Sequence, residues 1–312
     1  MIKEITSRIF DIKRFALHDG PGTRVTVHLM GCPLSCLWCH NPEGISKNPM
    51  LLVRSNLCVC CGKCLDVCRN GAVTKKDGVI VTNMQVCTAC GTCATMCTAD
   101  AREICGVDIG VKEAANAVLA DESFFYDESF IDGDVHSRGG VTLSGGEPLA
   151  QPDFCMALLD LLGGKGVHRV IDTCGHISEE IILKAAERCE LFLFDIKHMD
   201  TVKHRELTGA GNELILSNLK KLCKAGSLVQ LRIPFIPGIN TDESNLNAVA
   251  ELAAGLDITG VRILPYHKMA EDKHRRFGLI FRLKNAREPS SDELRYAQDV
   301  FARKGLAAVI GG

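Results

Sequence analysis

Short apolar runs alternate with amphipathic stretches along most of the chain, which predicts strands that alternate with helices. The apolar runs are bounded by Gly, Asp or Pro, as strands usually are. These predicted strands span residues 24–31, 140–145, 169–175, 191–197, 228–238 and 261–267. The stretches between them place apolar residues at spacings of three and four, which is typical of a helix with one buried face. The predicted helices span residues 110–120, 152–163, 178–189, 212–225 and 242–255, and several begin with Ser, Asn or Asp as candidate N-caps.

This alternation predicts βαβ units, which place the strands parallel in one sheet. We therefore predict an α/β fold whose sheet is closed or partly closed into a barrel. Active sites of such barrels lie at the carboxyl ends of the strands. Residues 48–107 break the alternation, because they contain neither a long helix nor a long strand. We interpret them as an insert into a barrel formed by residues 1–47 and 108–312.

The composition is that of a globular protein. Of 312 residues, 46% are apolar and 24% are charged, which excludes disorder as the main state. The formal net charge of −2 gives no general attraction to nucleic acid or to an anionic membrane. No apolar run approaches the ~18 residues of a spanning helix, and the first residues lack the apolar segment of a secretion signal. We expect a cytoplasmic protein without nucleic-acid or membrane partners.

Cysteine is unusually frequent and unevenly distributed. The chain has 17 cysteines, and thirteen of them lie between Cys32 and Cys105. Without a secretion signal, an odd number packed so densely argues against a disulfide framework. It favours thiolate ligation of metal.

Eight of these cysteines form an internal repeat. Residues 58–68 and 87–97 both have the pattern C-x2-C-x2-C-x3-C and begin 29 positions apart. The spacing is typical of two-cluster ferredoxins, in which the fourth cysteine of each run binds the other 4Fe-4S cluster. The predicted ligand sets are therefore Cys58, Cys61, Cys64 and Cys97 for one cluster, and Cys87, Cys90, Cys93 and Cys68 for the other. The usual Pro after the fourth cysteine is replaced by Arg69 and Thr98, and a pair of zinc sites is the alternative. Cys60 lies outside the pattern.

An earlier trio has a different spacing. Cys32, Cys36 and Cys39 form C-x3-C-x2-C, with no fourth cysteine before Cys58. Three thiolates leave one iron of a 4Fe-4S cube without a protein ligand, and an open metal position can bind a substrate or cofactor. Taken alone, the trio is also compatible with a chance cluster or an incomplete zinc site.

The motifs resemble those of the radical S-adenosylmethionine superfamily and, more narrowly, of the glycyl radical enzyme activating enzymes. The matching motifs are H-D-G-P-G-T-R (18–24), G-C-P-L-S-C-L-W-C-H-N-P-E (31–43), S-G-G-E-P-L (144–149), D-T-C-G (172–175), F-D-I-K-H-M-D (194–200), R-I-P-F-I-P-G (232–238) and L-P-Y-H (264–267). The resemblance implies a partial parallel (β/α)6-type barrel. The insert is similar to the ferredoxin-like subdomain of those activators that carry two extra 4Fe-4S clusters, which the short pyruvate formate-lyase type lacks.

The resemblance also implies a site. Cys32, Cys36 and Cys39 would hold the radical-generating 4Fe-4S cluster, whose open iron binds S-adenosylmethionine. Asp195 and Lys197 would act at the cofactor. The full set of implied cofactor contacts is Trp38, His40, Asn41, Gly145, Gly146, Glu147, Asp172, Thr173, Asp195, Ile196, Lys197, Arg232 and His267. In shorter activators the two Asp positions and the Thr help to bind a monovalent cation, which adds this ion to the candidate cofactors. Taken singly, each polar residue could equally be a satisfied core or surface group, and G-G-E could be an ordinary turn.

The implied reaction is reductive cleavage of S-adenosylmethionine to methionine and a 5′-deoxyadenosyl radical. This radical takes a hydrogen atom from a glycine Cα in a partner glycyl radical enzyme and becomes 5′-deoxyadenosine. A flavodoxin or ferredoxin would supply the electron, and the extra clusters would relay it or serve the structure alone. Residues 18–24 are candidates for contacting the glycine loop, with Arg24 or Asp19 as anchors. The alternative for this segment is a Gly/Pro turn into the first strand.

Five further cysteines remain. Cys174 departs from the D-T-N-G common in the family, and we expect its thiol to face the cofactor without being a ligand. We interpret Cys105, Cys155, Cys189 and Cys223 as small buried apolar residues.

Two rival functions stay open beside the activator. One is a radical enzyme that acts on a small molecule or peptide and uses the extra clusters for redox chemistry. The other is a plain electron carrier, which leaves the three-cysteine motif and the G-G-E motif unexplained. The number of matching motifs, and the H-D-G-P-G segment in particular, favour the activator.

Overall fold

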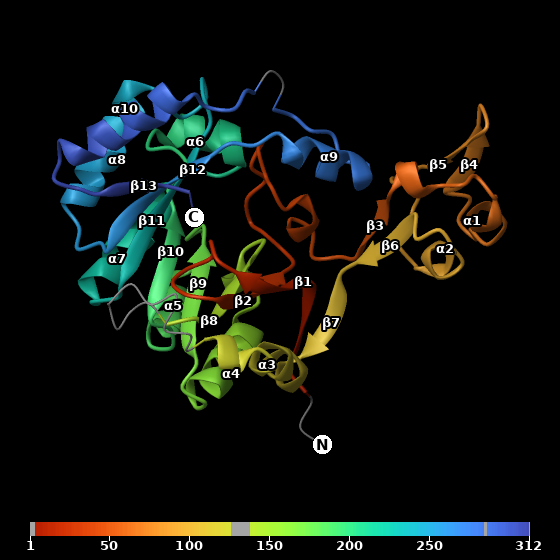
Figure 1. The fold of residues 1–312 in the computed structure, drawn as a ribbon, viewed down its shortest axis with the longest axis horizontal. Helices are drawn as coiled ribbons and strands as arrows, with labels where there is room; N and C mark the ends of the chain where they lie inside the picture. The colour runs from red at the N-terminus through yellow and green to blue at the C-terminus, as the bar shows by residue number, and fades with distance from the viewer. Residues whose placement is uncertain (1–3, 126–137, 284–285, 312) are drawn as a thin grey trace.

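The computed structural model describes residues 4–125, 138–283 and 286–311. Within these ranges, nine strands form one sheet in the order β13-β12-β11-β10-β9-β8-β2-β1-β7 (Figure 1). The strands of this sheet are β1 Thr6–Ala16, β2 Arg24–Leu29, β7 Val107–Gly110, β8 Gly140–Gly145, β9 His168–Thr173, β10 Leu191–Asp195, β11 Val229–Phe235, β12 Gly260–Pro265 and β13 Ala308–Ile310. Neighbouring strands run parallel from β2 through β8 to β13, whereas β1 is antiparallel to both β2 and β7. The fold is therefore α/β with a parallel sheet, consistent with a partial barrel.

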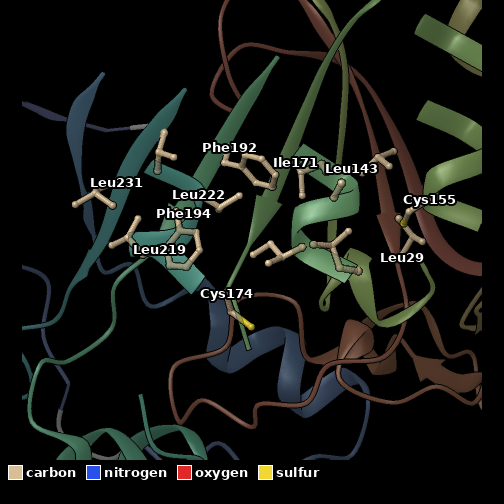
Figure 2. Packing of buried hydrophobic residues seen from close by; sticks show 14 of the residues in the cluster. Leu29, Leu143, Cys155, Ile171, Cys174, Phe192, Phe194, Leu219, Leu222 and Leu231 are labelled. Carbon is tan, nitrogen blue, oxygen red and sulfur yellow. The ribbon is translucent and has the colours of Figure 1, made fainter. Parts of the chain in front are cut away.

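Helices connect the parallel strands and pack on the sheet. They are α3 Val111–Leu119, α4 Pro152–Gly163, α5 Glu179–Ala186, α6 Thr201–Thr208, α7 Glu213–Lys224, α8 Glu243–Ala254, α9 Met269–Arg276 and α10 Ser291–Ala302. Helix α7 shows why the pattern folds this way, because Ile215, Leu219 and Leu222 lie on one buried face. Figure 2 shows the core where side chains of α7 and of the strands meet: Leu143, Ile171, Phe192, Phe194, Leu219 and Leu222.

The predicted elements are confirmed. Each of the six strands and five helices expected from the pattern is present, with ends within three residues of the prediction. Of the candidate N-caps, Asp242 accepts a hydrogen bond from the Asn245 N–H, as a cap should. Ser178 and Asn212 make no capping hydrogen bond. The Asn212 side chain donates instead to the His198 and Met199 carbonyls.

Residues 50–105 form small elements that project from the edge of the sheet (Figure 1). Strand β3 (Met50–Val53) pairs with β6 (Arg102–Cys105), and β4 (Val73–Lys76) pairs with β5 (Val79–Thr82). Each cysteine run contains a four-residue helix, α1 (Lys63–Asp66) or α2 (Thr92–Thr95). We call residues 58–105 the cysteine repeat unit. No helix in the described part of the chain is both long enough and apolar enough to span a membrane.

Candidate functional site

The loop that carries the three-cysteine motif follows β2 and is fixed by backbone hydrogen bonds. The Cys32 N–H donates to the Ile45 carbonyl at 3.1 Å. On its outer side, the Ser35 and Leu37 N–H groups donate to the Thr208 and Leu207 carbonyls at the end of α6, at 2.7 and 3.0 Å. Helix α6, which the pattern did not predict, therefore positions the cysteine loop.

Glycines allow this loop to lie directly on the turn after β8. The Gly31 N–H donates to the Gly44 carbonyl, and the Glu147 N–H donates to the Gly31 carbonyl, both at 2.8 Å. A Cβ atom on Gly146 would lie 2.2 Å from the Gly44 oxygen and 2.6 Å from the Gly31 oxygen. Gly145 also has a φ of 120°, which side-chain-bearing residues rarely adopt. The family resemblance implies that both glycines contact the cofactor, and the structure adds that Gly146 admits the cysteine loop whereas Gly145 lies against β2.

Glu147 is completely buried and joins two strand ends. Its carboxylate accepts hydrogen bonds from the Leu149 N–H at 3.1 Å, the Cys174 N–H at 2.8 Å and the Thr173 hydroxyl at 2.8 Å. Thr173 in turn accepts from the Gly175 N–H at 2.9 Å. Burial raises the pKa of Glu147. Both Glu147 oxygens and the Thr173 hydroxyl are therefore engaged by the chain itself.

Two ion pairs lie at the carboxyl ends of β9 and β10. The Lys197 Nζ lies 2.7 Å from an Asp195 oxygen, and the Arg232 guanidinium lies 3.2 Å from an Asp172 oxygen. Ser144 donates to the same Asp172 oxygen at 2.8 Å. Burial alone would lower the pKa of Lys197, but the Asp195 charge raises it well above its ordinary value. Both cations are therefore held charged in a nearly dry site.

Asp19 reaches the same interior from the loop before β2. It accepts a hydrogen bond from the Thr26 hydroxyl at 2.8 Å, and its charge acts on both Asp172 and Arg232. Arg232 lies in the middle of β11, where it pairs in register with Asp195. Ile196 is buried in the core, and its N–H donates to the Arg232 carbonyl at 2.9 Å.

The expectation that Arg24 anchors a partner's loop is wrong. Arg24 is 0% exposed, and burial lowers its pKa to about 9. Its guanidinium donates to the Thr142 hydroxyl and to the Pro21, Val141 and His168 carbonyls. These bonds lock the turn that leads into β2, so for Arg24 the alternative structural role holds.

The residues around the third cysteine form a second packed group. Trp38 is buried against Tyr266, and the His40 ring meets Tyr266 edge-on at 6.2 Å. The Asn41 side-chain oxygen accepts from the Lys273 ammonium at 3.0 Å. Lys273 also pairs with Glu43 at 2.7 Å, so α9 clamps this side of the loop.

His267 does not join this packed group. Its side chain is 59% exposed and faces Glu288 at 3.7 Å, beyond the end of β12. It follows a predicted strand end like the other candidates, but it lies on the surface.

The three thiols of the motif lie in different surroundings. Burial raises the pKa of Cys36 to about 11 and that of Cys39 to about 12. A hydrogen bond with the Cys174 thiol lowers the pKa of Cys32. Figure 2 shows Cys174 just beyond β9, at the margin of the labelled core side chains. Since metal ligation requires thiolates, a bound metal would have to displace protons from Cys36 and Cys39.

The donor set fits a cluster better than a single ion. In the described ranges, no three His, Cys, Asp or Glu side chains are arranged around one point as they would be for a single metal ion. In a 4Fe-4S cube each thiolate binds its own iron, so the sulfurs need not converge. Three thiols beside a buried lysine therefore suit a cluster with one open iron.

Two hollows in the cysteine repeat unit separate its eight repeat cysteines into the predicted sets. Each has about 360 Å³ of empty space, part of it open to solvent. One is lined by Cys58, Cys61, Cys64 and Cys97. The other is lined by Cys68, Cys87, Cys90 and Cys93. Cys60 also borders the first hollow, but Ala89 occupies the equivalent position in the second copy. The fourth cysteine of each copy therefore lines the hollow formed by the first three cysteines of the other copy.

Comparison with known proteins agrees with this geometry. Residues 132–246 match the model of the radical SAM superfamily. The chain is 38% identical to the trans-4-hydroxy-L-proline dehydratase activating enzyme of Clostridioides difficile, over 97% of this chain and 99% of that protein. It is also 38% identical to the choline trimethylamine-lyase activating enzyme of Oleidesulfovibrio alaskensis, over 86% of each chain.

Among solved structures, a radical SAM methyltransferase from Sphaerobacter thermophilus superposes with a TM-score of 0.51 at 14% identity. The match covers 92% of this chain and 66% of that one. At this identity it supports the fold alone.

Proposed function

Because the chain belongs to the glycyl radical enzyme activating enzymes of the radical SAM superfamily, we propose that Cys32, Cys36 and Cys39 hold its radical-generating 4Fe-4S cluster. The chain is a radical SAM oxidoreductase that activates a glycyl radical enzyme. The observation that best supports the residue assignment is the fixed cysteine loop, which lies against the Gly146 turn.

The bound groups supply the radical chemistry, and the chain orients them and excludes water from the site. When bound, the cluster provides the electron that cleaves S-adenosylmethionine to the 5′-deoxyadenosyl radical, which takes hydrogen from the partner's glycine. Lys197 and Asp195 present fixed opposite charges to a zwitterionic ligand at this edge of the sheet. Trp38 closes the side near Cys39 against water.

The remaining predicted contacts divide into direct and indirect ones. We assign Gly145, Asp172 and Arg232 to the cofactor side, together with His40, Asn41 and Ile196. Glu147 and Thr173 act indirectly, because their polar atoms already bind the chain and hold the Gly146 turn to β9. Asp172 and Asp195 would be the carboxylates for a monovalent cation, although each already pairs with a cation of the chain, Arg232 or Lys197. His267 would reach a ligand only at the mouth of the site.

We further propose that residues 48–107 are a ferredoxin-like insert with two more 4Fe-4S clusters, in a barrel of residues 1–47 and 108–312. The two hollows with four cysteines each support this proposal. The extra clusters would pass electrons from a flavodoxin or ferredoxin toward the radical site.

The test is activation itself. The protein is reconstituted anaerobically with iron and sulfide, reduced with S-adenosylmethionine present, and mixed with one glycyl radical enzyme at a time. The first partners to try are those activated by the relatives: trans-4-hydroxy-L-proline dehydratase, choline trimethylamine-lyase and 4-hydroxyphenylacetate decarboxylase. We expect a glycyl radical signal by electron paramagnetic resonance, with 5′-deoxyadenosine in matching amount. Absence of cleavage in fully loaded, reduced protein would refute the cluster assignment.

A further inference from the structure

The two copies of the cysteine repeat differ at one buried position. Adding the repeat offset of 29 to Val73 gives Arg102, and both side chains are 5% exposed. The residues before them are also equivalent, since Ala72 and Ala101 are each 1% exposed. One copy therefore buries an apolar side chain where the other buries a guanidinium.

Arg102 lies between the two hollows. Its Nη1 donates to the Cys93 sulfur at 3.8 Å, and the same side chain lines the hollow that contains Cys64. Its other terminal nitrogen donates to the Thr82 hydroxyl at 2.9 Å. Cys64 lines one hollow and Cys93 lines the other. One side chain thus bridges the two proposed ligand sets.

Arg102 lacks an acidic partner within the part of the chain that the structure describes, where none of its nitrogens lies within 4.0 Å of a carboxylate. A buried charge without a counter-charge is strongly destabilising. A 4Fe-4S cluster with four thiolate ligands is anionic, and hydrogen bonds to its sulfurs tune its reduction potential. Two such clusters would supply the charge that Arg102 lacks.

We propose that Arg102 is a positioning residue that binds one ligand sulfur of each extra cluster and raises the reduction potentials of both together. The proposal rests on the two-cluster insert of the proposed function. Each cluster becomes more negative on reduction, so a shared cation stabilises both reduced states.

The test compares Arg102→Met with Arg54→Met in reconstituted protein. Arg54 is a matched control, because it also lies in this region but pairs with Glu103 and the Asp100 carbonyl rather than with sulfur. Redox titration followed by electron paramagnetic resonance gives the midpoint potential of each cluster. We expect Arg102→Met to lower both midpoints by about 59 mV or more, a tenfold change in each one-electron equilibrium. Arg54→Met should leave the one-electron equilibrium of each cluster within a few-fold of its value in the parent protein.

Two further variants keep the test decisive if Arg102→Met fails to load iron. Arg102→Lys retains the charge and should hold both midpoints closer to those of the parent than Arg102→Gln does. A change in only one midpoint, or equal midpoints in the Lys and Gln variants, would overturn the bridging role. Iron and sulfide content of the parent protein tests the proposed function separately, because a parent with a single cluster refutes the two-cluster insert whatever Arg102 does.

Discussion

The three-cysteine loop and the cysteine repeat unit hold their sulfur atoms by different means. The loop is fixed by hydrogen bonds to the main sheet and to α6, and Cys32 and Cys36 pack against a large apolar core. The repeat unit has four-residue elements and a small core in which Cys64 and Cys93 are themselves members. In the first region main-chain hydrogen bonds position the cysteines, whereas in the second we expect bound clusters to complete the fold.

The largest expected effect separates the two regions by activity. Cys36→Ala removes a proposed ligand of the radical cluster, so we expect no detectable 5′-deoxyadenosine and, if all three proposed clusters bind, about one third less iron per chain. Cys61→Ala removes a ligand in the repeat unit, and cleavage with a strong chemical reductant should persist. Product chromatography and iron assay measure both variants. Equal loss of cleavage in both would contradict the division of roles.

Removal of iron should then separate the regions by stability. We expect amide hydrogen exchange in residues 58–105 to become at least about tenfold faster in apo protein, because that unit loses the groups that fill its two hollows. Strands β8 to β11 should exchange as before. The Cys36→Ala variant is the control, since it retains the repeat clusters and should keep that unit protected. Uniform exchange changes across the chain would argue against this difference.

A smaller effect tests the contribution of Glu147 to the stability of the main sheet. Glu147→Ala leaves three buried donors without an acceptor, and we expect the free energy of unfolding to fall by about 3 kcal/mol. Chemical denaturation of apo protein measures it, since no cluster is then involved. Glu180→Ala is the control: Glu180 is exposed and pairs with Lys184 on α5, so the change in the free energy of unfolding should be too small to resolve. A loss no larger than that of the control would show that Glu147 does not join the two strand ends.

The smallest effect concerns Cys60. Its counterpart Ala89 shares the left-handed backbone, with φ of 50° against 54°. Cys60→Ala should therefore leave iron content unchanged and alter the unfolding free energy by less than about 0.5 kcal/mol. Loss of iron in this variant would make Cys60 a ligand and weaken the equivalence of the two copies.

The parallel strands and their helices could be predicted because burial on both faces leaves a strong apolar pattern. Strand β1 was missed because its run of charges looks like an exposed segment, although it pairs on both sides. Helices α6 and α9 were missed because most of their residues are polar. Helix α6 fixes the cysteine loop through two backbone carbonyls, and α9 fixes it through Lys273. Hydrophobic periodicity does not reveal such contacts.

The candidate site shows the same limit. Cysteine spacing indicated both the three-cysteine loop and the crossed sets of the repeat, and the binding of clusters by these cysteines stays a prediction. The role predicted for Arg24 was wrong, because the sequence does not reveal the backbone carbonyls that bind its guanidinium. His267 lies at the surface, and the sequence does not reveal this exposure either. Arg102 left a usable signal, since alignment of the two copies puts it opposite Val73.

The joint between the repeat unit and the sheet also bears on how such a chain could change length. A Cβ atom on Gly106 would lie 3.2 Å from the Pro49 Cα, so the segment leaves and rejoins the sheet at almost one point. A stretch of gene encoding the residues between them could be lost or gained without altering the strand order on either side. Gain or loss of the cysteine-rich segment thus needs only two neighbouring breakpoints. The catalytic sheet could then evolve independently of the segment that we propose supplies its electrons.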